Sequence, residues 1–222
     1  GSAEAGATVE ITDGNGSLFD TVTADGDGAW NTTITPADST TGALTAVATD
    51  TDGNVSTDTK TYSLGDTGND ALNGSVNDDV LYGGLGNDAL NGDTGNDVLI
   101  GGKGDDTLTG GLGDDVFKWT LADQGDTSAP ASDVITDFGT GNDVLDLRDL
   151  LVNESEQTIG DFLSVTEDND DLVFQVTHDG GSNGATQTIT LQGKSFADFG
   201  GAQNADELIQ NMLDSGQLKI DT

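Results

Sequence analysis

Aspartate recurs every nine residues through the middle of the chain, a spacing that suits metal chemistry. The positions are Asp70, Asp79, Asp88, Asp97, Asp106 and Asp115. Carboxylates in glycine-rich loops are hard oxygen donors, and Ca2+ takes about six to eight oxygens, some of them from backbone carbonyls. Softer metals prefer His or Cys, and the chain has one His and no Cys, while Mg2+ demands a tighter octahedron. The residue types therefore indicate calcium.

These aspartates belong to six nonapeptides over residues 65–118, GDTGNDALN, GSVNDDVLY, GGLGNDALN, GDTGNDVLI, GGKGDDTLT and GGLGDDVFK. Every copy has Gly first, Asn or Asp fifth, Asp sixth and a large apolar residue eighth: Leu72, Leu81, Leu90, Leu99, Leu108 and Phe117. The last three positions predict a short strand with one inward side chain, and the first six predict a turn. Such short strands need neighbours, so we expect two facing parallel sheets with copy n stacked on copy n+2. Six copies then make three coils of a right-handed parallel β-roll.

Stacking is expected to place the sixth-position Asp of each coil over that of the next. The expected pairs are Asp70 with Asp88, Asp79 with Asp97, Asp88 with Asp106, and Asp97 with Asp115. Two carboxylates about 5 Å apart repel by about 0.8 kcal/mol in water and about 3 kcal/mol at an effective dielectric of about 20. We therefore expect that the roll does not form without metal and that it binds several calcium ions, about four or more.

The nonapeptide resembles the RTX repeat, G-G-x-G-x-D-x-U-x with U apolar, and this resemblance implies a calcium-binding β-roll. In that family, loop carbonyls share the metal with the sixth-position aspartates, so the six aspartates are the expected ligands. The candidate set also includes the fifth-position residues Asn69, Asn87 and Asn96. The second copy departs from the pattern at Ser75 and Asn77, which predicts a weakened loop because Asn tolerates a left-handed backbone.

The amino-acid composition also indicates a chain that needs cations in order to fold. The 222 residues include 41 acids and 6 bases, a net charge of −35, which excludes nucleic-acid binding because a phosphate backbone needs a basic face. Without cysteine, neither disulfides nor thiolate metal sites stabilise the fold, so the chain should be close to unfolding without counter-ions. No apolar run is long enough to span a membrane, and we expect a monomer.

Residues 1–64 show short alternating runs separated by Asp-Gly and Asn-Gly turns, as in "ATVEI", "ALTAVATD" and "DTDGNVS". This segment resembles the bacterial Ig-like repeats of large surface adhesins, which implies an antiparallel β-sandwich. It is short for that fold, so one or two first strands are expected to be absent. Trp30 is expected in the core between the sheets. Asp13, Asp50 and Asp52 are either calcium ligands at a domain end or ordinary turn residues.

Residues 119–222 predict a β-rich α+β domain with one amphipathic helix that begins after Asn204, has Glu207 in a capping box and ends at Gly216. This block resembles the C-terminal target domain of large RTX adhesins exported by type I secretion. The resemblance implies a signal near residues 204–222, read by an inner-membrane ATP-driven transporter that works with an adaptor and an outer-membrane pore. The helix could instead close the domain core, or do both. Asp137 and Asp143 are expected either to add calcium at the end of the roll or to form turns.

One apparent catalytic motif, G-x-S-x-G, spans residues 180–184, with His178 before it. A nucleophile elbow needs a strand-to-helix turn and a later His, so we expect no enzyme activity. The sequence predicts a calcium-dependent folding and type I secretion module at the C-terminus of a surface adhesin of a Gram-negative bacterium. The alternatives are the RTX tail of a secreted hydrolase, or a ligand- or ice-binding roll. A ligand- or ice-binding array needs its Thr side chains on one side of the roll, whereas Thr67 and Thr94 should lie on opposite sides, which argues against that alternative.

Overall fold

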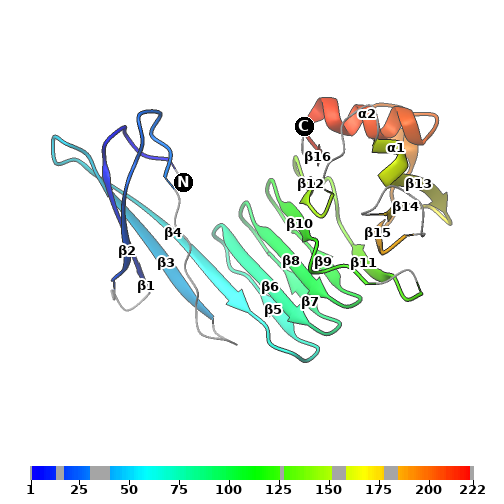
Figure 1. Cartoon of the computed structure of the whole chain (residues 1–222), viewed down its shortest axis with the longest axis horizontal. Helices are drawn as coiled ribbons and strands as arrows, with labels where there is room; N and C mark the ends of the chain where they lie inside the picture. Colours follow the sequence, from blue (N-terminus) through cyan, green and yellow to red (C-terminus); the bar gives the residue numbers. More distant parts are fainter. Residues whose placement is uncertain are drawn as a thin grey trace.

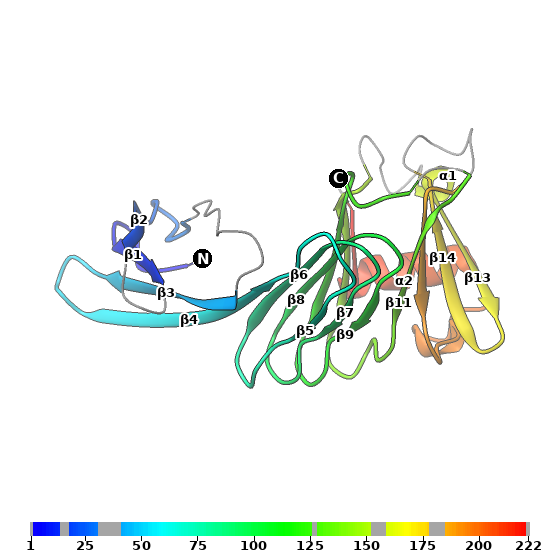
Figure 2. The ribbon, with the colours of Figure 1, turned by 90° about the horizontal axis from the view of Figure 1, so that it is seen from below.

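The computed structural model describes residues 2–13, 18–30, 41–125, 128–151, 159–177 and 185–220, which are mainly β (Figure 1). They form a nine-stranded sheet in the order β16-β12-β10-β8-β6-β4-β3-β1-β2 and a seven-stranded sheet in the order β13-β14-β15-β11-β9-β7-β5. The coils of the roll stack side by side between an N-terminal sheet and a C-terminal region (Figure 2). In the described part of the chain, no helix is long and apolar enough to cross a membrane.

The N-terminal segment forms four antiparallel strands, β1 (Thr8–Asp13), β2 (Leu18–Thr23), β3 (Thr41–Thr49) and β4 (Val55–Leu64). All four lie in one sheet. The described residues include no second sheet facing this one, so the sandwich stays a prediction. Trp30 is half-buried.

The repeats alternate between the two sheets. The odd copies supply β5 (Ala71–Asn73), β7 (Ala89–Asn91) and β9 (Thr107–Thr109), and the even copies supply β6 (Asp79–Leu85), β8 (Val98–Lys103) and β10 (Val116–Thr120). Pairing is parallel and in register, with Leu72 beside Leu90 on one side and Leu81 beside Leu99 on the other. The expected stacking of copy n on copy n+2 is therefore confirmed for these strands.

The eighth-position side chains fill the space between the two sheets. From Leu81 to Phe117 they are at most 1% exposed, whereas Leu72 is only partly buried. Leu72 lies on β5, the last strand of its sheet, and so has no coil beyond it. One inward apolar residue per copy gives the roll a narrow core.

Parallel pairing continues past both predicted ends of the roll. At the N-terminal end β4 pairs with β6, so the Ig-like segment shares a sheet with the repeats. Past residue 118, β11 (Ala131–Ile135) pairs with β9, and β12 (Val144–Asp149) pairs with β10. Ile135 lies beside Leu108 and Leu145 beside Phe117, so both strands continue the inward apolar rows.

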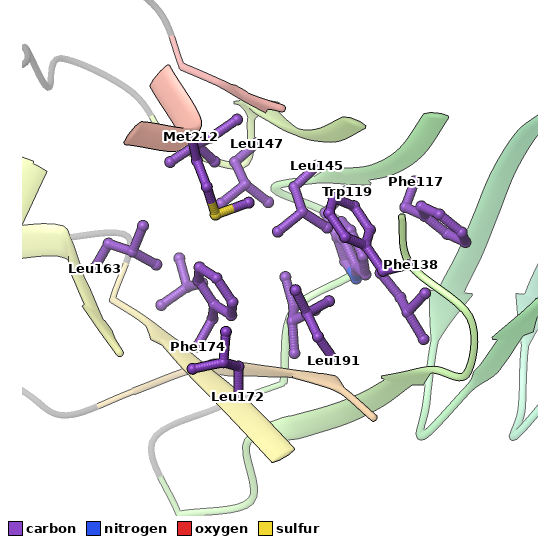
Figure 3. Close-up of a cluster of buried hydrophobic side chains, with 14 of the residues drawn as sticks. Phe117, Trp119, Phe138, Leu145, Leu147, Leu163, Leu172, Phe174, Leu191 and Met212 are labelled. Atoms are coloured by element: carbon purple, nitrogen blue, oxygen red, sulfur yellow. The ribbon is translucent and has the colours of Figure 1, made fainter. Parts of the chain in front are cut away.

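The C-terminal region adds β13 (Leu163–Asp168), β14 (Asp171–Val176) and β15 (Gln187–Leu191) to one sheet and β16 (Leu218–Lys219) to the other. Helical segments are α1 (Ile159–Phe162), the 3-10 turn η1 (Phe196–Asp198) and α2 (Ala205–Ser215). As predicted, α2 begins after Asn204, whose side chain accepts the Glu207 N–H, and ends at a left-handed Gly216. Its Met212 reaches into the same buried cluster as Trp119 and Phe138 (Figure 3).

Candidate metal centre

The sixth-position aspartates form two rows, which we call the inner ladders. From the second coil onward, the Oδ1 of each accepts the backbone N–H of the sixth-position Asp one coil earlier. The N–O distances are 2.8 Å for Asp70–Asp88, 2.7 Å for Asp79–Asp97, 2.8 Å for Asp88–Asp106 and 2.9 Å for Asp97–Asp115. These are the four pairs expected from the nine-residue period. The stacked loops therefore hold a column of carboxylates on each side of the roll.

The other oxygen of most of these carboxylates has no partner. Oδ2 is buried and unpaired in four aspartates, and Oδ1 is so in a fifth: Asp88, Asp97, Asp106, Asp115 and, for Oδ1, Asp79. These five residues are at most 3% exposed. A buried carboxylate oxygen without a donor or a cation is costly, so each of these atoms calls for a positive partner.

First-position glycines border these oxygens. A Cβ at Gly83 would lie 2.3 Å from Oδ2 of Asp88 and 2.4 Å from the carbonyl oxygen of Gly101. Gly92 stands in the same way to Oδ2 of Asp97 and the Gly110 carbonyl, at 2.3 and 2.4 Å. A carboxylate oxygen and a backbone carbonyl oxygen thus converge beside each glycine. This donor set suits calcium and fits the ligands that the sequence predicts.

The first coil differs from the later ones. In Asp70 and Asp79, Oδ2 accepts the N–H of the second residue of the same copy, at 2.9 Å from Asp66 and 2.5 Å from Ser75. Ser75 and Asn77 do not adopt the left-handed backbone that Asn was expected to tolerate at the fourth position. In the second and third coils the second position is left-handed, even where it is Asp93, with φ 76°. The loops with both a left-handed second residue and an unpaired Oδ2 therefore begin at the third copy.

The fifth-position side chains form an outer ladder that runs in the opposite direction. Oδ1 of Asn69 accepts the N–H of Asn87 at 2.9 Å, and Oδ1 of Asn87 accepts that of Asp105 at 3.1 Å. Oδ1 of Asn96 accepts the N–H of Asp114 at 2.8 Å. Asn69, Asn87 and Asn96 are exposed, and the structure places their side-chain oxygens on the backbone of the next coil.

Beyond the repeats, Asp143 continues the even-copy ladder and Asp137 does not. Oδ1 of Asp143 accepts the Asp115 N–H at 3.0 Å, and its Oδ2 accepts the Gly139 N–H at 2.6 Å. Asp137 accepts the N–H groups of Gly110 and Gly111, at 3.0 and 2.8 Å. Both carboxylates thus close the last repeat loop through protein donors.

Sequence reasoning missed Asp133, which continues the odd-copy ladder. Its Oδ1 accepts the Asp106 N–H at 2.8 Å, although 27 residues separate the two. Asp133 and Ile135 repeat the spacing of the sixth-position Asp and the eighth-position apolar residue. That signal was present, but no Gly-rich turn precedes it.

The N-terminal candidates give less support for a metal. Oδ1 of Asp50 accepts the N–H groups of Asp52 and Asn54, and its Oδ2 accepts the Asn54 side chain at 2.6 Å. These bonds, first the side-chain bond from Asn54, lower the pKa of Asp50, as expected of a turn residue. Asp52 is exposed, and the side chain of Asp13 lies outside the described residues, as do His178 and residues 180–184.

Burial and the repulsion between neighbouring carboxylates both raise the pKa values of aspartates in the inner ladders. Desolvation, followed by repulsion from neighbouring aspartates, raises the pKa of Asp97 to about 7 and those of Asp106 and Asp115 to about 6. Among the described residues, no three His, Cys, Asp or Glu side chains cluster on one point, so carbonyl oxygens must complete any site. A bound cation would offset the repulsion within the ladders.

Comparison with known proteins agrees with this geometry. Residues 1–64 match the family model of the bacterial Ig domain, and residues 64–99 and 82–117 match that of the RTX calcium-binding nonapeptide repeat. The chain therefore combines a bacterial Ig-like segment with RTX calcium-binding repeats. Such repeats are typical of secreted or extracellular bacterial proteins.

Solved structures similar to the chain include two subunits of a mannuronan C5-epimerase from Azotobacter vinelandii. AlgE6R3 is 30% identical with a TM-score of 0.46, over 59% of this chain and 74% of that one. AlgE6R2 is 29% identical with a TM-score of 0.47, over 59% and 83%. The extracellular lipase LipA from Serratia marcescens is 17% identical with a TM-score of 0.25, over 68% and 27%. No curated protein matches the chain.

Proposed function

We propose that the chain is a calcium-dependent folding and type I secretion module at the C-terminus of a bacterial surface adhesin. The observation behind the proposal is the set of buried, unpaired Oδ2 atoms in the inner ladders. Four such atoms, each beside a first-position glycine, suggest four calcium ions, held by Asp88, Asp97, Asp106 and Asp115 with loop carbonyls. The cation would supply the positive charge that the stacked loops lack.

Calcium would act by mass action on folding. A ligand that binds only the folded state stabilises it by RT ln(1 + [L]/Kd), about 1.4 kcal/mol per site at a concentration about tenfold above Kd. Four sites would add roughly 5 to 6 kcal/mol, the size of a whole domain's stability. This contribution vanishes at the low calcium of the cytosol, so the chain would stay unfolded inside the cell and fold outside it.

Export would use the C-terminal segment, near residues 204–222, as the address for the inner-membrane transporter, with its adaptor and outer-membrane pore. Folding on the outside would then oppose backsliding through the pore. The Ig-like segment favours an adhesin over the tail of a secreted hydrolase, and the proposal includes no catalytic activity. The module would act as a monomer at the cell surface or outside the cell.

A paired set of variants tests the proposal. Asp106→Asn with Asp115→Asn removes two unpaired carboxylates, whereas Asp105→Asn with Asp114→Asn makes the same charge change one residue away, where other copies already carry Asn. Circular dichroism during a calcium titration should show the first pair folding at about tenfold higher calcium or more, and the second close to wild type. Magnesium should not replace calcium.

Secretion gives the second readout. The Asp106 and Asp115 double variant should accumulate inside cells that express a type I system, while the Asp105 and Asp114 variant is exported normally. Full β-structure of the wild type after calcium removal would overturn the folding mechanism. Normal export of the first variant would overturn the link between calcium and export.

A further inference from the structure

The end of the odd-copy ladder is built differently from the rest of it. Asp133 is 0% exposed, and its Oδ2 accepts two side-chain donors, the Trp119 indole N–H at 2.6 Å and the Gln187 amide at 2.8 Å. In the three preceding coils the odd-copy carboxylates have no side-chain donor on Oδ2. Protein side chains thus bond Oδ2 of Asp133, whereas the corresponding Oδ2 of Asp88 and Asp106 has no partner.

These donors come from both sides of the roll. Trp119 lies on β10 in the nine-stranded sheet, while Asp133 on β11 and Gln187 on β15 lie in the seven-stranded sheet. Trp119 and Gln187 are at most 1% exposed, and Trp119 belongs to the cluster that contains Met212 of α2. The bonds to Asp133 therefore link the last odd-copy loop to the C-terminal core, in which Trp119 and Met212 belong to one cluster (Figure 3).

A side-chain hydrogen bond joins Asp133 to the repeats. Its Oδ1 accepts the N–H of Asp106, whose own Oδ2 is buried and unpaired. With both oxygens already bonded to protein, Asp133 has less to offer an ion than Asp106 has. Its position instead fixes the backbone of the residue expected to hold the ion. Groups that orient a metal ligand from outside commonly change metal affinity by about 10- to 100-fold.

We propose that Trp119 and Gln187 are positioning residues for the calcium site of Asp106, acting through Asp133. They close the odd-copy ladder with protein donors in place of a further cation. Calcium at Asp106 is thereby coupled to the C-terminal core, and Asp133 itself takes no ion. The inference rests on the proposed binding of calcium by Asp106.

The test compares two substitutions in the full chain. Trp119→Phe removes the indole donor and leaves a buried aromatic ring, whereas Phe117→Leu removes a similar buried ring without a polar bond and installs the residue of all five other copies. Calorimetric calcium titration should show one site weakened about tenfold or more in Trp119→Phe and no comparable change in Phe117→Leu. Gln187→Met should weaken calcium binding at the same site. The loss of affinity in the double variant with Trp119→Phe should be smaller than the sum of the two single losses in free energy.

Tryptophan emission identifies the site. In a Trp30→Phe background, Trp119 is the only tryptophan, and its emission should follow the calcium step that Asp106→Asn weakens. Equal losses of affinity in Trp119→Phe and Phe117→Leu, or none in either, would overturn the positioning role. Absence of calcium binding by the wild type would instead overturn the proposed function, so the two failures are distinguishable.

Discussion

The roll and the C-terminal region both bury aspartate, but they satisfy its oxygens in opposite ways. In the roll, five sixth-position aspartates each leave one buried oxygen unpaired. In the C-terminal region, Asp133 is bonded by Trp119 and Gln187, and Asp146 is bonded by Arg148 at 2.8 and 2.6 Å. Within the described residues, every buried carboxylate oxygen without a partner lies in the repeats. The roll thus leaves buried oxygens open to cations from solution, whereas the C-terminal region supplies its own donors.

Apolar burial sharpens this contrast. The roll has one inward apolar residue per copy, while the C-terminal region packs two sheets and α2 around a cluster that includes Phe138, Phe174 and Met212. Burial of each large apolar side chain is worth about 1.5 to 3 kcal/mol. The C-terminal region therefore has a source of stability that does not require metal.

Calcium removal should produce the largest effect, and it should divide the molecule. Without calcium we expect the amides of β6 to β9 to exchange hydrogen as in an unfolded chain, because the short strand ladders and narrow apolar core of each coil are too small to offset the repulsion between its carboxylates. The amides of β14, β15 and α2 should exchange at least about tenfold more slowly than those of the roll. Hydrogen exchange with mass spectrometry, with and without chelator, measures both regions in one sample.

Uniform loss of protection in both regions would break the comparison, since it would mean that the C-terminal core needs the roll in order to fold. Uniform retention would mean that the repeats fold without cations. The same hydrogen-exchange measurement with magnesium in place of calcium serves as the control, because the amides of the roll should exchange in magnesium as fast as they do without metal.

A single methyl group at the first position of a repeat should give the next largest effect. In Gly83→Ala the new Cβ would meet Oδ2 of Asp88 and the Gly101 carbonyl, the two oxygens expected to face the ion. We expect a loss of about 1 to 3 kcal/mol in the calcium-loaded state from overpacking, together with weaker binding. Gly26→Ala is the matched control, since its Cβ would have no atom within 4 Å and its φ is not left-handed. Thermal unfolding in calcium measures both, and equal stability of the two variants would contradict the assigned geometry.

Acid should partly replace calcium in the roll. The pKa values of Asp97, Asp106 and Asp115 are raised from 3.8 to about 7, 6 and 6, mainly by burial, so the folded state binds more protons than the unfolded state between about pH 4 and 7. Stability of the calcium-free protein therefore falls as pH rises through this window. The lowered pKa of Asp146 acts in the opposite direction, but only below about pH 4.

Urea titration in metal-free buffer should accordingly show an unfolding transition of the roll at pH 5 that is absent at pH 7.5, where the calcium-free roll is unfolded. In calcium the order should reverse, because protons compete with the ion for the same carboxylates. The same metal-free unfolding curve at both pH values would mean that these carboxylates are not buried in the folded state.

The sequence predicted the features that a short period determines. Six copies in phase were sufficient to predict the strands of the roll, their stacking and the pairs of stacked aspartates, and Asn204 with Gly216 predicted α2. Three features depend on long-range pairing and could not be predicted in this way. These are the sharing of a sheet by β4 and β6, the use of Asp133 after a 27-residue interval, and the side-chain donors at Trp119 and Gln187. The second copy, which departs from the repeat pattern, was predicted only in part, because Ser75 and Asn77 do not adopt a left-handed backbone.

The smallest predicted effect concerns the N-terminal end of the roll, where the Ig-like segment brings a cation of its own. Lys60 on β4 forms an ion pair with Asp78 at 3.0 Å, and both side chains are about two-fifths exposed, at 42% and 41%. Exposed pairs of this kind contribute about 0 to 1 kcal/mol, so Lys60→Met should lower the stability of the calcium-loaded protein by about 0.5 kcal/mol, and less at high salt. Urea unfolding at low and high salt, with Lys194→Met as a control outside the roll, measures the difference. A loss as large as that expected of Gly83→Ala would show that this end, like the C-terminal end, is closed by protein groups, and that only the middle coils depend on calcium.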